Sequence, residues 1–293
     1  MNNCFYLHYE KDKKSLIYTY FWALIPLILF SFYKNGILLY QNNYISFIDM
    51  FLPFYFYLVS MGIGYLVALI KKENKWEFLL YSLIISCTVS INTNMFIYPV
   101  LLFVLLFIMS CISEKKSFNL VSGVRVFLVL ALLLQQYSYL NVGEKIGAFN
   151  YSLWDTFMGF GISGIGTSSL FLQLICFLIL IFNKFYKRSI PIIASCFYFL
   201  SFFFLYCITK DVVCLENILS GTVYFAFLFV GADLYATPNT KKGMILYGGV
   251  IGFLTFILSL ILPIYEAPYI AIFIISFLIP FINRFWFKKD LHS

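Results

Sequence analysis

Long runs of apolar residues follow one another through almost the whole sequence, and they constrain the fold more than any other feature. Of the 293 residues, 62% are hydrophobic and 11% are charged. Soluble domains carry about 25% charged residues. Apolar runs of roughly 20 residues can cross a bilayer as helices. They do not alternate apolar and polar residues, as the strands of membrane barrels do. We therefore expect an all-α polytopic membrane protein, embedded in the lipid bilayer.

Ten such runs are predicted to span the membrane. They cover residues 16–33, 47–70, 76–91, 95–113, 119–140, 169–186, 190–208, 215–231, 243–262 and 268–286. Between the fifth and the sixth, the segment SLWDTFMGFGISGIGTS (152–168) is too short and too rich in glycine for an ordinary span. Re-entrant or broken elements have this character, and they occur at membrane depth where protein buries them or they line a cavity.

The basic residues predict the orientation of the spans, because cytoplasmic loops carry an excess of lysine and arginine. With the N-terminus in the cytoplasm, 16 of the 20 basic residues fall on the inner side, and Lys34, Lys145 and Lys210 fall on the outer side. Arg125 lies inside a span. This asymmetry predicts both termini in the cytoplasm of a multi-pass protein of the bacterial plasma membrane. Membrane orientation thus explains the net charge of +7, and no nucleic-acid partner is expected.

Ten spans divide into two sets of five that would face opposite ways across the membrane. Span 3 leads into SINTNMF (90–96) and span 8 into ATPNTKKG (236–243), which are polar breaks after apolar runs. Inverted repeats with interrupted helices are the architecture of many transporters, although ordinary turns favour the same residues. We expect ADLYATPNT to fold against SINTN. The expected units are a first repeat at 1–140, an outward loop with a re-entrant segment at 141–168, and a second repeat at 169–293.

Two charged residues inside or beside the spans are candidates for function. Arg125 lies six residues into span 5, where a charge faces the bundle interior, a partner or a cavity, unless its side chain reaches the interface. Asp233 closes span 8, where a carboxylate meets the negative end of the helix dipole, so it faces water or lines a cation path. Thr237, Pro238 and Thr240 then predict a turn, because proline stops the helix and threonine can cap the next one.

The glycine-rich segment GFGISGIGTSSL (159–170) ends in Thr167, Ser168 and Ser169 at the start of span 6. Such a backbone suits a phosphate, because free N–H groups at a helix N-terminus point outward. Glycine and serine also let membrane helices pack closely, so both interpretations stay open. The seven cysteines form no C-x-x-C pair, and the two histidines lie near the chain ends. No serine-hydrolase elbow, P-loop, zinc signature or dinucleotide fingerprint occurs, so a hydrolytic or metal-dependent enzyme is not expected.

The C-terminal part of the sequence carries motifs of a known family. The stretches SGTVYFAFLFVGADLYATPNTKKGMILYGGVIGFLTFIL (220–258) and YEAPYIAIFIISFLIPFINR (265–284) resemble the C-terminal block of the RnfD/NqrB family. Its members are membrane subunits of the Rnf and sodium-pumping quinone oxidoreductase complexes. The matching positions are Ser220, Gly221, Ala226, Phe227, Asp233, Pro238, Thr240, Gly243, Tyr247, Gly248, Gly252, Leu254, Thr255, Glu266, Ala271, Pro280 and Arg284.

Earlier blocks are similar to the family as well. ALIP (23–26) resembles A-L-L-P, FNLVSGVRVF (118–127) resembles F-N-P-A-L-V-G-R-x-F, and TFMGFGISGIGTSSL (156–170) aligns with L-F-L-G-N-I-G-G-S-I-G-E-T-S. The resemblance implies a subunit that couples electron flow to Na⁺ or H⁺ movement, with other membrane subunits as partners. The expected cofactor-binding residues are Asn119, Arg125, Gly164, Gly166, Thr167, Ser168 and Ser169. The expected ion or solute path holds Asp233, Thr237, Pro238, Thr240 and Glu266.

The sequence departs from the family where a flavin is attached. The family links flavin mononucleotide (FMN) to a threonine of an S-G-A-T motif in the outward loop. The corresponding loop here, QYSYLNVGEKIGAFNYSLWD (136–155), contains no threonine before Thr156. Thr167 stands where the family has glutamate, Leu120 where it has proline, and Ala267 where it has glycine. We therefore expect no covalent FMN, and any bound FMN or riboflavin should be noncovalent.

Two hypotheses for the function follow from the sequence. The chain is either a redox-complex subunit that helps to couple electron flow to ion movement, or a stand-alone transporter or binding module for a small solute such as a flavin or its precursor. Neighbouring genes for the other subunits of such a complex would favour the first hypothesis, and their absence the second.

Overall fold

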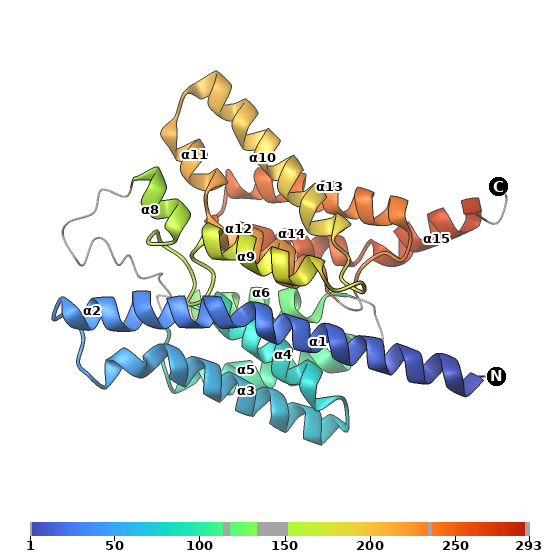
Figure 1. The fold of residues 1–293 in the computed structure, drawn as a ribbon, viewed down its shortest axis with the longest axis horizontal. Coiled ribbons are helices and arrows are strands. Elements are labelled where there is room, and N and C mark those ends of the chain that lie inside the picture. The colour runs from blue at the N-terminus through green and yellow to red at the C-terminus, as the bar shows by residue number, and fades with distance from the viewer. Residues whose placement is uncertain (1, 114–117, 134–151, 234–235, 291–293) are drawn as a thin grey trace.

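The computed structural model describes residues 2–113, 118–133, 152–233 and 236–290, and every regular element in these ranges is a helix (Figure 1). The first half contains α1 (Asn2–Phe32), the π-helical turn η1 (Tyr33–Ile37), α2 (Leu38–Gln41), the 3-10 turn η2 (Asp49–Phe51), α3 (Leu52–Lys71), α4 (Lys75–Thr88), α5 (Ile97–Ser113) and α6 (Leu120–Leu133). The second half contains α8 (Leu153–Met158), α9 (Leu170–Ile181), α10 (Ser189–Thr209), α11 (Val212–Ile218), α12 (Gly221–Phe225), the π-helical η3 (Ala226–Gly231), α13 (Lys241–Ser259), α14 (Ala267–Ser276) and α15 (Ile279–Asp290).

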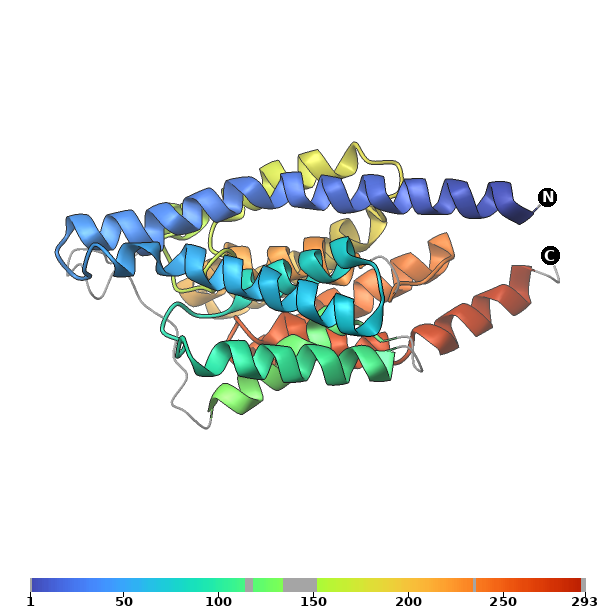
Figure 2. The same cartoon turned by 90° about the horizontal axis from the view of Figure 1, so that it is seen from below.

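The apolar helices confirm the prediction of a polytopic membrane protein. Five helical segments are long and apolar enough to cross a bilayer: Lys13–Gln41, Asp49–Lys71, Ser189–Thr209, Val212–Gly231 and Lys241–Ser259. Four shorter apolar helices, Ile97–Ser113, Leu120–Leu132, Leu170–Ile181 and Ala267–Ser276, accompany them. Together with α4, these segments account for each of the ten predicted spans. Figure 2 shows that α1 begins and α15 ends at the same end of the bundle.

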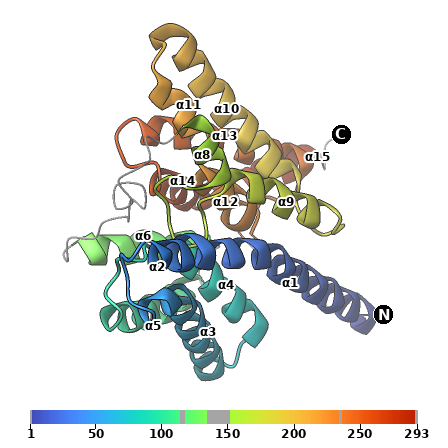
Figure 3. The same ribbon diagram turned by 60° about the vertical axis from the view of Figure 1, so that its left-hand side comes forward.

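The helices of the two halves pack in corresponding ways. In the first half α3 contacts α4 and α5, and α5 contacts α6, whereas in the second half α10 contacts η3 and α13, and α13 contacts α14. The halves meet where α1 lies against α9 and where α6 lies against α14. Figure 3 shows the hairpin of α10 and α11 standing out from the rest of the second half. These contacts do not give the relative orientation of the two halves, so the division into two inverted repeats stays a prediction.

Two helices, α4 and η3, end against other segments of the protein, at opposite ends of the bundle. The end of α4 contacts the glycine-rich segment, because the Val89 carbonyl accepts from the Ile165 N–H (2.8 Å). The end of η3 instead lies near the beginning of α4, since Asp233 and Glu77 line one cavity. The expectation that ADLYATPNT folds against SINTN is therefore wrong. The two helices run antiparallel, so their C-terminal ends point to opposite sides.

The eighth predicted span is not one continuous helix. It is interrupted between α11 and α12, where Ser220 has an extended backbone. Gly221 lies so close to the backbone of Ser168 that an added Cβ atom would stand 2.4 Å from the Ser168 carbonyl oxygen. A side chain at this position would therefore push the start of α12 away from α9. Beyond this contact the helix widens into the π-helical η3 before it ends at Gly231.

Candidate functional site

Backbone carbonyl groups in η3 and in the stretch just beyond it accept hydrogen bonds from side chains of four other segments. The hydrogen bonds run from Tyr186 to Leu228 (3.0 Å), from Asn119 to Val230 (2.7 Å), from Tyr20 to Ala232 (3.0 Å) and from Tyr247 to Ala236 (3.4 Å). Inside a membrane such carbonyl groups must find partners within the protein. Because tyrosine hydroxyls and an amide supply them, this helix end is held in a cage of polar side chains.

Asp233 lies within this cage and is 6% exposed. Its carboxylate accepts hydrogen bonds from the Tyr81 hydroxyl (3.3 Å) and the Ala236 N–H (3.4 Å). Thr237 donates to the Asp233 backbone carbonyl (3.0 Å) and itself accepts from the Lys187 ammonium. Burial lowers the pKa of Lys187, and the Asp233 charge opposes that shift. A carboxylate and an ammonium therefore stand at one broken helix end.

A cavity of about 470 Å³ opens beside Asp233, and we call it the Asp233 cavity. Its wall includes the carboxylates of Glu73, Glu77 and Asp233, and Lys13 forms an ion pair with Glu77 (2.6 Å). The remaining lining residues are Asn74, Phe78, Tyr81, Ser110, Ser113, Phe118, Leu120 and Ala236. Each of the three carboxylates has a lysine nearby, since Lys71 pairs with Glu73 (3.3 Å), Lys13 pairs with Glu77, and Lys187 bonds Thr237 beside Asp233. The cavity is thus lined by charged groups of both signs.

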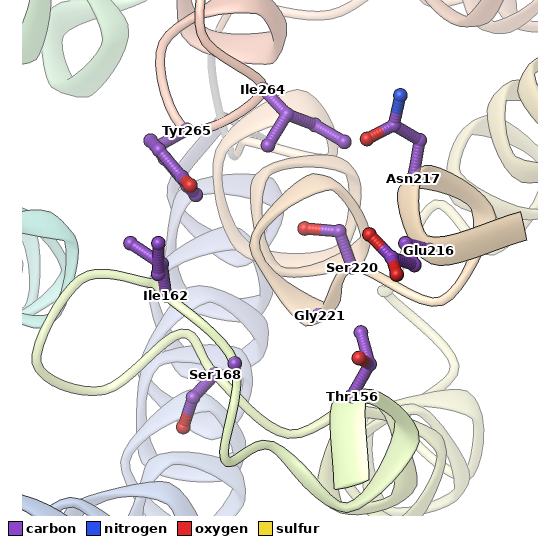
Figure 4. Close-up of a pocket in the computed structure, with 10 residues that line it drawn as sticks. Thr156, Ile162, Ser168, Glu216, Asn217, Ser220, Gly221, Ile264 and Tyr265 are labelled. Carbon is purple, nitrogen blue, oxygen red and sulfur yellow. The ribbon is translucent and has the colours of Figure 1, made fainter. Parts of the chain in front are cut away.

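A second cavity, of about 410 Å³, lies at the other end of the bundle, and we call it the Glu216 cavity (Figure 4). It is lined by Thr156, Gly161, Ile162, Ser168, Glu216, Asn217, Ser220, Gly221, Ile264 and Tyr265. Figure 4 shows Glu216 and Asn217 on one helix beside Ser220, with Ile162 and Tyr265 on the other side of the space. One carboxylate, an amide and several hydroxyls thus line this cavity, and no lysine or arginine is among the described lining residues.

Part of the glycine-rich segment, where the sequence predicts a phosphate site, is bonded to the end of α4. The N–H groups of Ile165 and Gly166 donate to the Val89 and Cys87 carbonyls (2.8 Å each), so they are not free. An added Cβ atom at Gly164 would lie 2.6 Å from the Thr88 carbonyl oxygen, which shows that close helix packing requires the glycine. Ser169 caps α9 through the Leu172 N–H (3.2 Å).

Thr167 is fully buried in the same segment, and its hydroxyl lies 3.1 Å from that of Thr222. Ser168 is therefore the member of the predicted phosphate set that lines the Glu216 cavity. The N–H groups of Ile165, Gly166 and Thr167 are bonded to backbone carbonyls, so these three donors are not free for a phosphate group. The rest of the predicted phosphate set stays a prediction. Packing of the stretch 164–169 against α4, α9 and α12 explains the small residues of the glycine-rich segment.

Lys34 and Asn35 hold the glycine-rich segment from the other side. Lys34 is 2% exposed and lies in η1, within the apolar segment Lys13–Gln41, and not in the outer loop where the charge pattern put it. Its ammonium donates to the Gly161 carbonyl (2.5 Å) and the Ser163 hydroxyl (3.2 Å). The Asn35 amide donates to the Ile165 carbonyl (3.2 Å).

The comparison with protein families accounts for nearly the whole chain. The model of the NQR2, RnfD, RnfE family matches residues 2–292. The chain belongs to this family. It is therefore a membrane subunit of the type found in Rnf and Nqr complexes. A comparison with curated proteins finds no match.

Arg125 of this family member pairs with Glu266, which the sequence had assigned to a different role. The guanidinium donates to the Glu266 carboxylate (2.9 Å), with side-chain exposures of 0% and 12%. The Tyr269 ring lies 5.4 Å from the guanidinium carbon. The pair joins α6 to the beginning of α14, which are the helices where the two halves meet. Its position makes it a link between the halves.

The predicted cofactor residues thus occupy three separate places in this family member. Asn119 bonds the end of η3, Arg125 bonds Glu266, and the glycine-rich segment packs against α4. Among the predicted path residues, Asp233 and Thr237 lie together at the broken end of η3. Thr240 caps α13 through the Gly243 N–H (3.1 Å), so the predicted turn and cap are confirmed.

Sequence reasoning missed Glu216 and Lys34 as site residues. Glu216 is a lone acid at the edge of a predicted span, and no local pattern reveals its neighbours. Lys34 follows a span directly, so the charge rule put it outside the membrane. The remaining signal was the polar pair Lys34–Asn35, which interrupts an apolar run that resumes at Ile37.

Proposed function

We propose that this family member couples electron flow in its complex to Na⁺ or H⁺ movement, along a path between the Asp233 cavity and the Glu216 cavity. One observation carries the proposal: the interrupted segment α12–η3 has one end at each cavity. Ser220 and Gly221 at its start line the Glu216 cavity, and Asp233 just beyond its end lines the other. Interrupted helices between two polar cavities are typical of membrane proteins that move ions.

The antiparallel α4 supports the same path. Asn74 and Glu77 at its start line the Asp233 cavity. Its end is bonded to the stretch 164–166, which follows the Gly161–Ile162 wall of the Glu216 cavity. Between the cavities the hydroxyls of Thr167 and Thr222 meet (3.1 Å), and such oxygen atoms are ligands for small cations.

The proposed setting is a multi-subunit complex of the bacterial plasma membrane, with other membrane subunits as partners and both termini in the cytoplasm. The Asp233 cavity then faces the cytoplasm and the Glu216 cavity faces outward. Family membership supports the complex, and the distribution of basic residues supports the orientation.

Asp233→Asn tests the path in the complex assembled with its partner subunits in sealed vesicles. The expected result is electron transfer that continues while driven Na⁺ or H⁺ uptake falls by about tenfold or more, because a neutral amide loses the charge that attracts a cation. Glu73→Gln is the matched control, since its side chain also lines the cavity but is 38% exposed. Unchanged uptake in Asp233→Asn would refute the proposed path.

We also propose that the chain carries no covalent flavin and that any bound FMN or riboflavin is noncovalent. Thr167 is buried, and the Thr156 hydroxyl donates to the Ser152 carbonyl (3.3 Å). After coexpression with the family's flavin transferase, the denatured 34.1 kDa band should show no flavin fluorescence in a gel. Any yellow colour should leave with acid precipitation. A fluorescent band that Thr156→Ala abolishes would overturn this proposal.

A second candidate function is the transport or binding of a small solute such as a flavin or its precursor. The Glu216 cavity, at about 410 Å³, has the size of a small-molecule site, with polar groups at one wall and Ile264 and Tyr265 nearby. Titration of the purified chain with riboflavin, followed by quenching of flavin fluorescence, tests this candidate. Saturable binding that Glu216→Gln or Ser220→Ala weakens would favour it over ion coupling alone.

A further inference from the structure

The side-chain amino group of Lys34 is buried, and the partners to which it donates are neutral. Its ammonium donates to the carbonyl oxygen of Gly161 (2.5 Å) and to the hydroxyl oxygen of Ser163 (3.2 Å). In the part of the chain that the structure describes, no carboxylate lies within ion-pair distance of this ammonium. A buried ammonium without an anionic partner is unfavourable, because the interior of a membrane protein replaces little of its hydration. Its presence therefore calls for a functional explanation.

The local backbone is unusual at the same position. The π-helical turn η1 interrupts the first long helix and places Lys34, Asn35 and Gly36 in buried positions. Such turns are rare and occur frequently at functional sites. From η1, Lys34 bonds Gly161 and Ser163, and Asn35 bonds the Ile165 carbonyl. The turn η1 therefore holds the glycine-rich segment at two points.

The oxygen atoms around the Lys34 ammonium are of the kind that coordinate small monovalent cations. Backbone carbonyls and hydroxyls replace the hydration shell of an ion in membrane pores. Gly161 is also part of the wall of the Glu216 cavity. The Lys34 ammonium thus occupies an oxygen site at the edge of the Glu216 cavity. In the proposed function, mobile cations pass through this cavity.

We propose that Lys34 is the electrostatic barrier of the Glu216 cavity, and that its ammonium occupies the Gly161–Ser163 oxygen site and prevents passive flow of monovalent cations. This inference rests on the proposed cation path and adds the residue that keeps it closed. A mobile cation is repelled by the ammonium and finds the two oxygen atoms already bonded. It can pass only when the ammonium leaves these oxygens, which requires movement of η1 or of the stretch 161–163.

Passive Na⁺ uptake into liposomes that contain the purified chain, driven by a membrane potential, tests the barrier. The wild-type chain should be tight, and Lys34→Met should leak Na⁺ at least about tenfold faster, because even part of the Coulomb repulsion from one unit charge has this effect. Lys34→Arg keeps the charge and should stay tight. Lys210→Met, which removes a lysine from the end of α10, is the matched control and should behave as the wild type.

A second variant keeps the test decisive if Lys34→Met does not fold. Ser163→Asp puts a carboxylate beside the ammonium, which neutralises the barrier without removing Lys34, so this protein should leak. Ser163→Asn is similar in size but neutral and should stay tight. Folded Lys34→Met or Ser163→Asp protein that is as tight as the wild type would overturn the proposal.

The liposome leak test can succeed or fail independently of the uptake test of the proposed function. Leakage through Lys34→Met combined with an assembled complex that drives no ion uptake would support the barrier and refute the coupling. Driven uptake that depends on Asp233, combined with tight Lys34→Met liposomes, would support the coupling and refute the barrier. A leak of equal size for Na⁺ and for the much larger choline ion would also refute the barrier, because it would indicate a general loss of packing.

Discussion

The two helices that end within the bundle, α4 and η3, are closed by different means. At the end of α4, backbone N–H groups of Ile165 and Gly166 bond the last carbonyls, and no ionisable side chain takes part in these bonds. At the end of η3, side chains of tyrosine and asparagine make the equivalent bonds, and Asp233 lies among them. Hydrogen bonds between two backbone segments, which we call the seal, need the two segments in close contact. Hydrogen bonds from side chains, which form the cage around η3, can change when a side chain rotates. We therefore expect the end of η3 to change its bonding more readily than the end of α4.

The largest expected difference comes from the same substitution at each helix end. At Gly164 an added Cβ atom would stand 2.6 Å from the backbone oxygen of Thr88, whereas at Gly231 the nearest atom is 3.6 Å away. Gly164→Ala should therefore destabilise the protein by about 2–3 kcal/mol, the usual effect of overpacking. Gly231→Ala should stay within about 0.5 kcal/mol. Thermal unfolding in detergent measures both, and equal losses would contradict the distinction between seal and cage.

A smaller effect is expected when one bond of the cage is removed. Tyr20→Phe deletes the hydroxyl that donates to the Ala232 carbonyl (3.0 Å) and should destabilise the protein by about 1–2 kcal/mol, since a buried carbonyl loses its partner. Tyr18→Phe is the matched control, because Tyr18 lies on the same helix and is 48% exposed. Hydrogen exchange of residues 226–233 should rise in Tyr20→Phe and not in Tyr18→Phe. Unchanged exchange in both would mean that the hydroxyl does not hold this helix end.

The smallest effect is a dependence on pH. Burial lowers the pKa of Lys187 below its ordinary value of 10.5, so the folded state binds its proton less tightly than the unfolded state does. Between the lowered pKa and 10.5 the unfolded state holds more protons, and stability therefore rises with pH. The penalty is fully present below the lowered pKa and is lost as pH approaches 10.5. Lys187→Met should flatten this rise in thermal stability. A slope that does not change would exclude Lys187 as its source.

The sequence predicted the spans well because hydropathy is a local property. Apolar runs such as 190–208 and the cap at Thr240 depend on neighbouring residues, and both are found in the structure. The family motif around Asp233 is equally local. These features were therefore within reach of the sequence alone.

The contacts of the site depend on residues far apart in the chain, and local patterns do not contain them. Lys34 meets Gly161 across 127 positions, and Asn119 meets Val230 across 111. The stretch Ile165–Gly166 looks the same in sequence whether its N–H groups face a phosphate or the carbonyls at the end of α4. The partner decides between these interpretations, and only the fold supplies the partner.

The ion pair of Arg125 and Glu266 has a consequence for how the protein is made. The two residues are 141 positions apart, so the ribosome completes α6 long before α14 exists. An arginine inside a membrane helix is costly, up to about 2.5–3.5 kcal/mol at the helix centre on insertion scales, and the carboxylate that pairs with it has not yet been synthesised. During biogenesis we therefore expect the first half to be inserted before the Arg125 guanidinium can pair with Glu266. The ion pair between the two halves can form only after Glu266 has been synthesised.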